Sequence, residues 1–445
     1  VVSWELVSEE EGTGIVHIAP GCGKEDHDLG KKEKLPEISP LDESGNYLDG
    51  FDWLTGKNVG HVSRDIINDL ESRNFIYKTK DYFHRYPTCW RCNTELVFRL
   101  VNEWFISVNE IRPRMIEANK KIIWEPEHGG KIMEDWLNNM SDWLISRKRY
   151  WGLPLPIWEC ENNHIEVIGT KKDLLKKAIT DAKHLKELHR PWIDEVKIKC
   201  SHCHKEMTRI KDVGDAWLDA GIVPFSTLNY LDDKEYWKKW YPAEVIIEMR
   251  EQIRLWFYSL LFMAVTLENN TPYIKVLTHE KVHDELGRPM HKSGGNSIVL
   301  EEAAKNMGVD VMRWFYIKQD PKFNVNFGYK NSEVVKQTLS MLFNLISYLE
   351  MSTQGKKYLI SKKLEVEDKW MLSKLNTLIS EVTDNLESLT PNIATKKIED
   401  FFVTSFSRTY IQFIRDRVQS QDGKNRETAL GVLYEVNLTL IRLMA

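Results

Sequence analysis

The pattern of apolar residues divides the chain near residue 326. Beyond that point, apolar side chains recur every three or four residues, as they do on one face of an α-helix. Three such runs begin at Val334, Trp370 and Ile398, and glycine and proline become scarce. The spacing predicts an antiparallel bundle of amphipathic helices over residues 326–445. A basic run from Arg408 through Arg426 is interpreted as a solvated helix face.

The pattern before residue 326 is mixed. Short β-rich runs at 14–18, 243–247 and 274–279 alternate with stretches of helical spacing such as 300–307, and glycine and proline are frequent. This alternation is typical of α/β architecture, in which helices cover the faces of a sheet. We therefore predict an α/β fold followed by an all-α region.

Composition indicates a globular protein of several domains. The chain has 445 residues, is 42% hydrophobic and 29% charged, and carries a net charge of −5. This charge gives no global field for nucleic acid, although a local patch can still bind RNA. No apolar run reaches membrane-spanning length and no signal peptide is recognisable, so we expect a cytoplasmic protein. Because Val1 is not an initiator methionine and residues 438–445 still follow a helical pattern, we expect a piece of a longer protein.

Clustered cysteines without a secretory signal are more typical of metal sites than of disulfides. One group combines a Cys-x-x-Cys pair with an upstream cysteine and histidine. Its four members are Cys160, His164, Cys200 and Cys203. Three thiolates and one imidazole make a tetrahedral zinc set, so we predict zinc here, with His202 and His204 as competing ligands. Cys89 and Cys92 form a second pair, which is half of a site.

A charged, glycine-rich loop follows the predicted strand 274–279. It reads Pro289-Met290-His291-Lys292-Ser293-Gly294-Gly295. Glycine lets a backbone approach a phosphate closely, and lysine supplies a point charge. The segment resembles the second signature loop of class I aminoacyl-tRNA synthetases, Lys-Met-Ser-Lys-Ser, with Pro289 and His291 at the first lysine and first serine. The resemblance implies that Lys292 and Ser293 are catalytic, with Lys292 stabilising charge as an amino-acid carboxylate attacks the α-phosphate of ATP.

A second motif covers residues 248–257, after an apolar strand. It resembles Glu-Gly-x-Asp-Gln-x-Arg-Gly-Trp-Phe of the isoleucyl members of the family, and Met249 and Glu251 stand where that pattern has its first glycine and its aspartate. The match implies that Glu248 and Gln252 contact the aminoacyl-adenylate and that Trp256 packs near it. By themselves, these residues equally fit a salt-bridged helix start.

Two further motifs support the resemblance. Residues 215–221 resemble Asp-x-Trp-Phe-Asp-Ser-Gly, which implies that Trp217 shapes the aliphatic side-chain pocket, although a core tryptophan is the simpler interpretation. Residues 143–158 resemble Trp-Cys-Ile-Ser-Arg-Gln-Arg-Tyr-Trp-Gly-x-Pro-x-Pro of isoleucyl and valyl enzymes. Within this motif, Arg147 and Arg149 either face tRNA or anchor the structure.

The first part of the chain resembles the hydrolytic editing domain of these enzymes. Residues 12–26 match its Gly-Thr-Gly-x-Val-His pattern, which implies that Asp26 anchors the α-amino group of a mischarged aminoacyl end; the alternative is a turn or cap residue. Residues 86–92 match Tyr-Pro-x-Cys-Trp-Arg-Cys. Because the family takes the partner cysteines from upstream sequence, we expect Cys89 and Cys92 to hold zinc poorly.

The resemblance implies a division into four parts. We expect the end of a partial β-rich editing domain over 1–85, a Cys-pair zinc stem over 86–101, the second half of a Rossmann-type catalytic domain over 102–325 with a zinc-ribbon insertion at about 158–210, and a truncated anticodon-binding bundle over 326–445.

The implied function is that of an isoleucine–tRNA ligase. Such an enzyme uses ATP with Mg²⁺ to activate L-isoleucine, transfers it to tRNA(Ile) and edits valine hydrolytically, because one methylene gives too little discrimination in an apolar pocket. We expect a monomer, inactive without the first Rossmann half. Two alternatives stay open: a valyl-tRNA synthetase and a non-catalytic, tRNA-binding synthetase-like protein.

Overall fold

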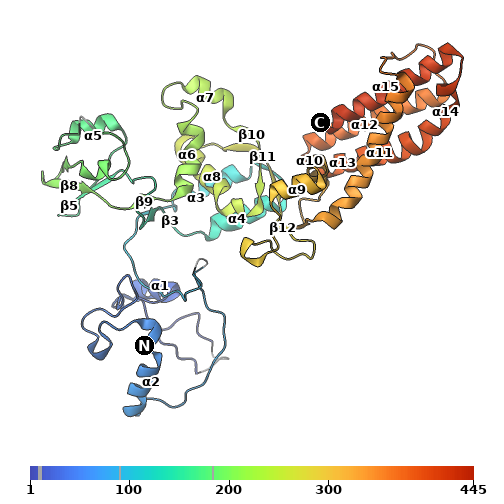
Figure 1. Cartoon of the computed structure of the whole chain (residues 1–445). Helices are drawn as coiled ribbons and strands as arrows, with labels where there is room; N and C mark the ends of the chain where they lie inside the picture. Colours follow the sequence, from blue (N-terminus) through green and yellow to red (C-terminus); the bar gives the residue numbers. More distant parts are fainter. Residues whose placement is uncertain (9–12, 90–91, 183–184) are drawn as a thin grey trace. The chain divides into compact units, whose positions relative to one another are not determined.

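The structure is a computed structural model that describes residues 1–445 except 9–12, 90–91 and 183–184, and except the Ser293 side chain. Gly12, Trp90 and Arg91 of the sequence motifs thus lie outside the described residues. The chain forms two compact units, residues 1–104 and 105–445, called unit 1 and unit 2 (Figure 1). None of the described helices combines the length and apolar character needed to cross a lipid bilayer.

Unit 1 holds helices but no strand among its described residues. Its elements are α1 (Lys24–Glu33), η1 (Asp52–Leu54), η2 (Val59–His61) and α2 (Ser63–Ser72). β pairing is limited to isolated bridges such as that between Leu41 and Tyr47. The predicted β-rich character of residues 1–85 is therefore wrong here. A strand requires a paired neighbour, and no described segment pairs with residues 14–18.

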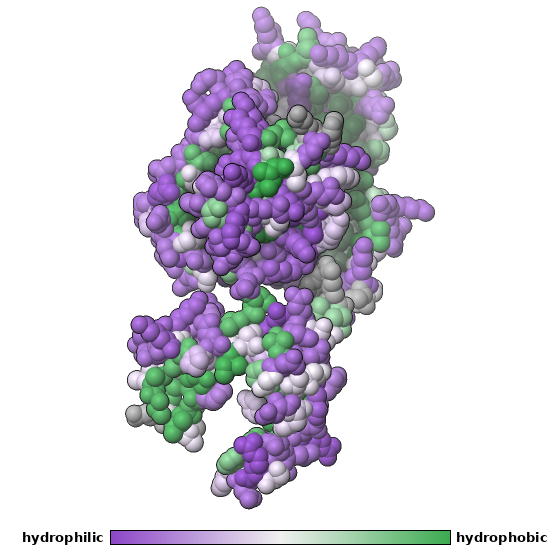
Figure 2. All heavy atoms as spheres, turned by 90° about the vertical axis from the view of Figure 1, so that its left-hand side faces the viewer, coloured by the Kyte–Doolittle hydropathy of each residue, from purple (hydrophilic) through white to green (hydrophobic). Residues whose placement is uncertain are grey.

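Unit 1 buries little apolar surface. Among its described residues, the buried apolar side chains are Pro20, Leu29, Leu41 and Val62. Several large side chains between residues 75 and 98 are instead more than half exposed, and apolar surface is visible on unit 1 in Figure 2. These side chains are Phe75, Tyr77, Tyr82, Phe83 and Phe98. Unit 1 thus owes little of its conformation to a core of its own.

Unit 2 begins with a three-stranded parallel sheet. The strands are β2 (Ile123–Glu125), β10 (Ala243–Met249) and β11 (Tyr273–His279), in the order β10-β11-β2. The strands predicted at 243–247 and 274–279 are thereby confirmed. The helices around the sheet are α3 (Arg112–Asn119), α4 (His128–Asn139), α6 (Ala216–Ser226), α7 (Lys234–Trp240), the short η4 (Arg250–Arg254) and α8 (Trp256–Glu268). Helix α8 connects β10 to β11 and is buried continuously from Phe257 to Val265, as expected of a crossover helix against a sheet.

Strand β10 is an edge of this sheet. It pairs with β11 from Ala243 to Met249, and no described strand pairs with its other side. Val245 and Ile247, on one face of β10, are both exposed.

A small antiparallel domain is inserted between α4 and α6. Its sheet has the order β6-β5-β8-β7, formed by β5 (Ile157–Cys160), β6 (Ile165–Val167), β7 (Ile198–Lys199) and β8 (Glu206–Arg209), with α5 (Lys171–Lys177) and η3 (Trp192–Glu195). Trp158, Ile198 and Met207 form the centre of its core. Two short antiparallel pairs lie at its base: β1 (Phe105–Ile106) with β3 (Trp143–Leu144), and β4 (Ser146–Arg147) with β9 (Val213–Gly214).

The helical part begins with α9 (Leu300–Met307), as the pattern at 300–307 predicts. Two short elements, β12 (Val282–His283) and η5 (Lys292–Gly294), precede α9 in the chain. After α9 come α10 (Val309–Ile317), β13 (Val325–Asn326), α11 (Tyr329–Thr353), α12 (Val366–Glu387), α13 (Pro391–Asp400), the π-helical η6 (Phe401–Tyr410), α14 (Ile411–Gln419) and α15 (Gly423–Met444). Their long helices lie side by side (Figure 1), around a core that includes Leu375, Phe402 and Leu433. The predicted bundle is confirmed.

A buried charged network ties three helices of the bundle together. Asp368, near the start of α12, is fully buried and accepts hydrogen bonds from the Tyr410 hydroxyl at 2.7 Å and from two nitrogens of Arg417 at 2.9 and 2.7 Å. Arg417 also pairs with Glu367 at 2.8 Å. The interpretation of the basic run as a solvated face is thus wrong for Arg417, because a carboxylate from another helix draws it inward.

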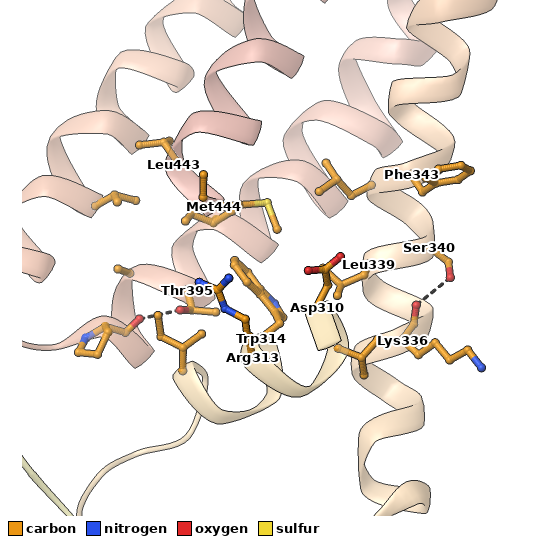
Figure 3. A pocket seen from close by; sticks show the side chains of 18 of the residues that line it. Asp310, Arg313, Trp314, Lys336, Leu339, Ser340, Phe343, Thr395, Leu443 and Met444 are labelled. Atoms are coloured by element: carbon orange, nitrogen blue, oxygen red, sulfur yellow. Dashed lines mark hydrogen bonds between the residues drawn. The ribbon is translucent and has the colours of Figure 1, made fainter. Parts of the chain in front are cut away.

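A cavity of about 700 Å³ lies between α10, α11, α13 and the end of α15 (Figure 3). Its wall is mainly apolar, with Trp314, Phe343 and Met444 among the lining side chains. No candidate catalytic or zinc-binding side chain that the structure describes lines it.

Candidate functional site

Glu248 lies at the carboxyl end of β10, where it pairs in register with Thr278 of β11. Open α/β sheets bind their ligands at this end of the strands. The side chain is half-buried, and its Oε2 accepts a hydrogen bond from the backbone N–H of Met249 at 3.0 Å. This bond fixes a carboxylate at the rim of the sheet.

Gln252 and Trp256 form the junction between η4 and α8. The Gln252 Oε1 accepts the backbone N–H of Trp256 at 3.3 Å, and the Trp256 indole donates to the carbonyl of Ala220 on α6 at 3.4 Å. Helix α6 approaches α8 so closely that a Cβ at Gly221 would lie 2.7 Å from the Ser259 carbonyl oxygen. Glycine is therefore required where these two helices meet.

Asp215 organises the start of α6, which carries Trp217. Its carboxylate accepts the backbone N–H of Trp217 at 3.3 Å and the Trp143 indole N–H at 3.2 Å, and it pairs with Arg147 at 3.1 Å. Sequence reasoning assigned no role to Asp215, although an aspartate before a helix is a common N-cap. The pairing makes Arg147 an anchor of the structure, whereas Arg149 is exposed. Trp217 itself is half-buried.

The signature loop is closed at its base by a buried carboxylate. Asp284 follows β12 and accepts the backbone N–H groups of Leu286 and Arg288 at 3.0 and 2.9 Å, the Arg288 Nε–H at 2.8 Å, and the Asn296 amide at 3.0 Å. These donors, that of Asn296 foremost, hold the pKa of Asp284 well below its usual range. The carboxylate therefore stays charged and fixes the turn.

Asn296 joins the far end of the loop to the same point. Its Oδ1 accepts the backbone N–H of His291 at 3.0 Å, and its Nδ2 donates to the carbonyl of Pro289 at 2.9 Å. Lys292 lies between these anchors, exposed in η5, and its amine makes no hydrogen bond to Glu248 in the described part of the chain. The loop is thus braced at its base while its lysine is free to meet a ligand. Sequence reasoning missed both anchors, although Asp-x-x-Gly at 284–287 is a turn signal.

We expect Asn296→Ala to loosen this loop. Loss of these hydrogen bonds costs about 1–2 kcal/mol, so trypsin should cleave after Lys292 about 5- to 30-fold faster. Ser297→Ala, an exposed change at the next position, is the matched control. Equal cleavage rates for Asn296→Ala and the unchanged chain would show that the brace does not hold the loop.

The predicted zinc ligands of the inserted domain converge. The ligand atoms of Cys160, His164, Cys200 and Cys203 all lie within 4.8 Å of one another. The sulfurs of Cys160 and Cys203 are 3.7 Å apart, and the His164 Nδ1 is 3.6 Å from the sulfurs of Cys160 and Cys200. A tetrahedron with ordinary zinc–sulfur and zinc–nitrogen bonds has edges of about 3.8 and 3.5 Å. The cluster is therefore compatible with zinc, and His202 and His204 lie outside the group.

The surroundings favour the thiolate of Cys200. The backbone N–H of Cys203 donates to the Cys200 sulfur at 3.5 Å and lowers the pKa of Cys200 to about 6. Next to Cys200, the Glu166 carboxylate accepts a hydrogen bond from the backbone N–H of Ser201 at 2.7 Å. It also forms an ion pair with Lys177. Burial alone would raise the pKa of Glu166, but these partners outweigh it and bring the pKa to about 2. The cysteine turn is thus held by a carboxylate that stays charged.

The purified chain should contain about one equivalent of zinc, carried by this cluster. The double variant Cys200→Ser, Cys203→Ser should lose nearly all of it, because serine is a poor zinc ligand and two of four donors are gone. Elemental analysis measures the content, with Cys22→Ser as the control at an exposed cysteine. Nearly one equivalent retained in the double variant would contradict the assignment.

Cys89 and Cys92 of unit 1 both contact Thr94. The backbone N–H of Cys89 donates to the Thr94 carbonyl at 2.8 Å, and the Thr94 hydroxyl lies 3.2 Å from the Cys92 sulfur. The Thr94 hydroxyl first, and then the Thr94 backbone N–H and the Cys89 thiol, lower the pKa of Cys92 to about 7. Within the described ranges, no third histidine, cysteine or carboxylate joins this pair.

Asp26 lies in the first turn of α1, and its carboxylate accepts the backbone N–H of Ala19 at 2.8 Å. It thereby closes the turn that contains the exposed Cys22. This contact is the one that the turn-residue interpretation predicts. An additional role toward a ligand stays a prediction.

Comparison with known proteins decides the family. Residues 26–328 match the family described as tRNA synthetases class I (I, L, M and V), and residues 368–445 match the anticodon-binding domain of tRNA ligase. The chain belongs to the class I tRNA synthetase family. Glu248, Gln252, Trp256, Trp217 and the Lys292 loop all fall inside the first match.

Curated relatives of this class I chain are named isoleucine–tRNA ligase. The protein of Methanothrix thermoacetophila is 35% identical over 447 residues and that of Pyrococcus furiosus 36% identical over 476, covering 98% and 100% of this chain. The alignments span 42% and 44% of the relatives' own length. The class I chain thus corresponds to less than half of these proteins.

Solved structures support the class I fold. A methionyl-tRNA synthetase of Mycobacterium tuberculosis, in complex with methionyl-adenylate, matches with a TM-score of 0.56 at 14% identity, over 81% of this chain and 62% of that one. An Agrobacterium radiobacter LeuRS in a ternary complex with tRNA matches with a TM-score of 0.50 at 22% identity, over 69% and 40%. The mixed α/β catalytic fold with a helical carboxy-terminal part is therefore shown.

Proposed function

We propose that this chain supplies the amino-acid-binding half of an isoleucine–tRNA ligase, which activates L-isoleucine with ATP and Mg²⁺ and transfers it to tRNA(Ile). The observation that carries the proposal is the placement of Glu248 at the carboxyl end of β10, beside Gln252 and Trp256. The names of relatives at 35–36% identity along the whole chain support isoleucine as the substrate.

The geometry suggests a role for each residue. The Glu248 carboxylate suits an amino group, and the Gln252 amide suits the polar part of an adenylate. Trp217 and Trp256 offer indole walls to an aliphatic side chain, on helices held together at Gly221. Lys292 and Ser293 stand on the braced loop, where a lysine can neutralise the charge that develops on the α-phosphate.

Other parts of the chain have supporting roles in this proposal. The cluster of Cys160, His164, Cys200 and Cys203 would hold zinc that stabilises the inserted domain. The helical bundle would bind the anticodon stem, in keeping with its family match. Asp26 would take part in editing, and Cys89 and Cys92 would need two further ligands to hold zinc.

The proposal is tested by ATP–pyrophosphate exchange and aminoacylation in a full-length protein that contains this chain. Isoleucine should support both reactions, and valine and leucine should support aminoacylation far less. The present chain alone should show no exchange. A preference for valine would indicate the valyl enzyme instead.

The substitutions in the signature loop favour one other candidate, a non-catalytic, tRNA-binding synthetase-like protein. Pro289 and His291 stand where the family has lysine and serine. The discriminating observation is a His-Ile-Gly-His type motif upstream in the coding sequence, together with measurable exchange. A full-length protein without either would have lost the activity.

A further inference from the structure

Two ion pairs continue the register of β10 and β11 beyond the end of the sheet. The strands pair in register up to Met249. At the next position, the Arg250 Nε lies 2.9 Å from a carboxylate oxygen of Glu280. One position further, the Lys281 amine lies 2.8 Å from a carboxylate oxygen of Glu251. The order of charges is reversed between the segments, so a shift by one residue in either direction would bring like charges together. The ion pairs thus specify one alignment.

The two aligned segments carry different parts of the candidate site. The segment after β10 is η4, which holds Gln252 and leads into Trp256. The segment after β11 leads through β12 to the signature loop with Lys292. Because strand pairing ends at Met249 and His279, the ion pairs link the segments where they leave the sheet. They therefore connect the amino-acid-binding residues to the base of the loop.

Backbone groups of the segment after β11 are bonded elsewhere. The N–H of Glu280 donates to the Pro321 carbonyl at 3.2 Å, and the carbonyl of Lys281 accepts the N–H of Val325 at 2.8 Å. The N–H of Lys281 donates to the side-chain oxygen of Asn324 at 3.2 Å. These bonds set the path of the backbone, and the two charged side chains are left to hold η4.

The carboxylates of the two pairs are more shielded than the cations. The Glu280 side chain is 11% exposed and that of Glu251 32%, whereas the side chain of Lys281 is 52% exposed. Burial alone would raise the pKa of Glu251, but the hydrogen bond from Lys281 and smaller contributions outweigh it and lower this pKa. The Glu251 Oε2 is buried and accepts no hydrogen bond from the described residues. Ion pairs this exposed contribute only about 0.2–1 kcal/mol to stability, so they align the segments more than they stabilise the fold.

We propose that the two ion pairs position the signature loop for adenylate formation. They hold the base of the loop against η4, so that Lys292 and the amino-acid-binding residues act from one fixed arrangement. The positioning residues are Arg250, Glu251, Glu280 and Lys281. The inference rests on the proposed function, because adenylate formation is the reaction that this site would catalyse. The four side chains act through the loop and through η4, and their role requires no contact with a substrate.

The first test is a double-mutant cycle in a full-length ligase that contains this chain, measured by isoleucine-dependent ATP–pyrophosphate exchange. Lys281→Met and Glu251→Gln should each lower kcat about 10-fold, because a misplacement of about 1 Å can cost up to about 10²-fold. The KM for isoleucine should stay near its original value, because the amino-acid-binding residues are unchanged. The variant with both changes should lose no more than either single variant, because both changes remove the same interaction.

Lys322→Met is the matched control. It removes an exposed lysine from the segment that contacts the backbone of Lys281, and it should leave kcat unchanged. Retained zinc content and helicity in Lys281→Met would exclude misfolding as the cause of a lower kcat. An unchanged kcat in Lys281→Met would overturn the proposal, as would losses that multiply when Lys281→Met and Glu251→Gln are combined.

The second test uses the present chain and needs no activity. Hydrogen exchange of the backbone amides of residues 284–296, followed by mass spectrometry, should be about 2- to 5-fold faster in Lys281→Met, the effect of losing an exposed ion pair. Equal rates in Lys281→Met and the unchanged chain would overturn the proposal. An inactive full-length protein whose loop is loosened by Lys281→Met would refute the proposed enzyme alone. An active one in which neither kcat nor the loop responds would refute the positioning role alone.

Discussion

Replacing Asp368 with alanine is expected to lower the free energy of unfolding of the helix bundle by about 3–5 kcal/mol. The Arg417 side chain, only 11% exposed, would keep Glu367 as its single acidic partner, and the Tyr410 hydroxyl would lose its acceptor inside the core. An uncompensated charge in the interior costs more than the intact network contributes, because its desolvation is no longer offset. Urea unfolding followed by far-ultraviolet circular dichroism measures the change.

Lys369→Ala serves as the control, because this neighbouring lysine is exposed and its removal should change stability by no more than about 0.5 kcal/mol. Removing both charges should be milder than removing one. Asp368→Leu combined with Arg417→Met is therefore expected to recover a large part of the loss. A single Asp368→Ala variant as stable as the unchanged chain would show that the network is dispensable.

Lys292→Ala is expected to slow isoleucine-dependent ATP–pyrophosphate exchange about 10²-fold or more in a full-length ligase that contains this chain. A preorganised cation opposite developing charge contributes on the order of 3 kcal/mol to the transition state and much less to the ground state. The loss should therefore fall mainly on kcat. Steady-state exchange kinetics, with the ATP concentration varied, separates an effect on kcat from an effect on the KM for ATP.

Lys305→Ala removes an exposed lysine from the neighbouring helix α9 and should leave exchange unchanged. It controls for the general loss of positive charge. If Lys292→Ala also exchanges at the original rate, Lys292 has no part in adenylate formation. The resemblance of this loop to the family's signature loop would then not predict a catalytic role.

Periodic patterns were sufficient to predict several elements of unit 2. The strands at 243–247 and 274–279 and the helix at 300–307 carry enough apolar side chains on defined faces to fix their type. The same pattern at 14–18 did not produce a strand, because strand formation depends on a partner elsewhere and not on the segment itself. Local pattern is thus a weaker guide wherever the pairing partner is remote.

The contacts that hold the sites have no periodic signal. Asp284 meets Asn296 across twelve positions, and Asp368 meets Arg417 across 49. A charged residue in a helical pattern is ordinarily assigned to solvent, so sequence reasoning placed Arg417 outside. The cysteine cluster was predictable, because metal-ligand chemistry restricts the residue types and their spacing far more tightly than a salt bridge does.

The open side of β10 has a consequence for the behaviour of the chain in solution. A row of unpaired backbone donors and acceptors, flanked by Val245 and Ile247, is a template that any extended segment can join. A second molecule can do so, and the frequency of such encounters rises with concentration. Self-association of this chain would then report an unsatisfied sheet edge and not a native quaternary structure, and a lysine at Val245 would suppress it without touching the site.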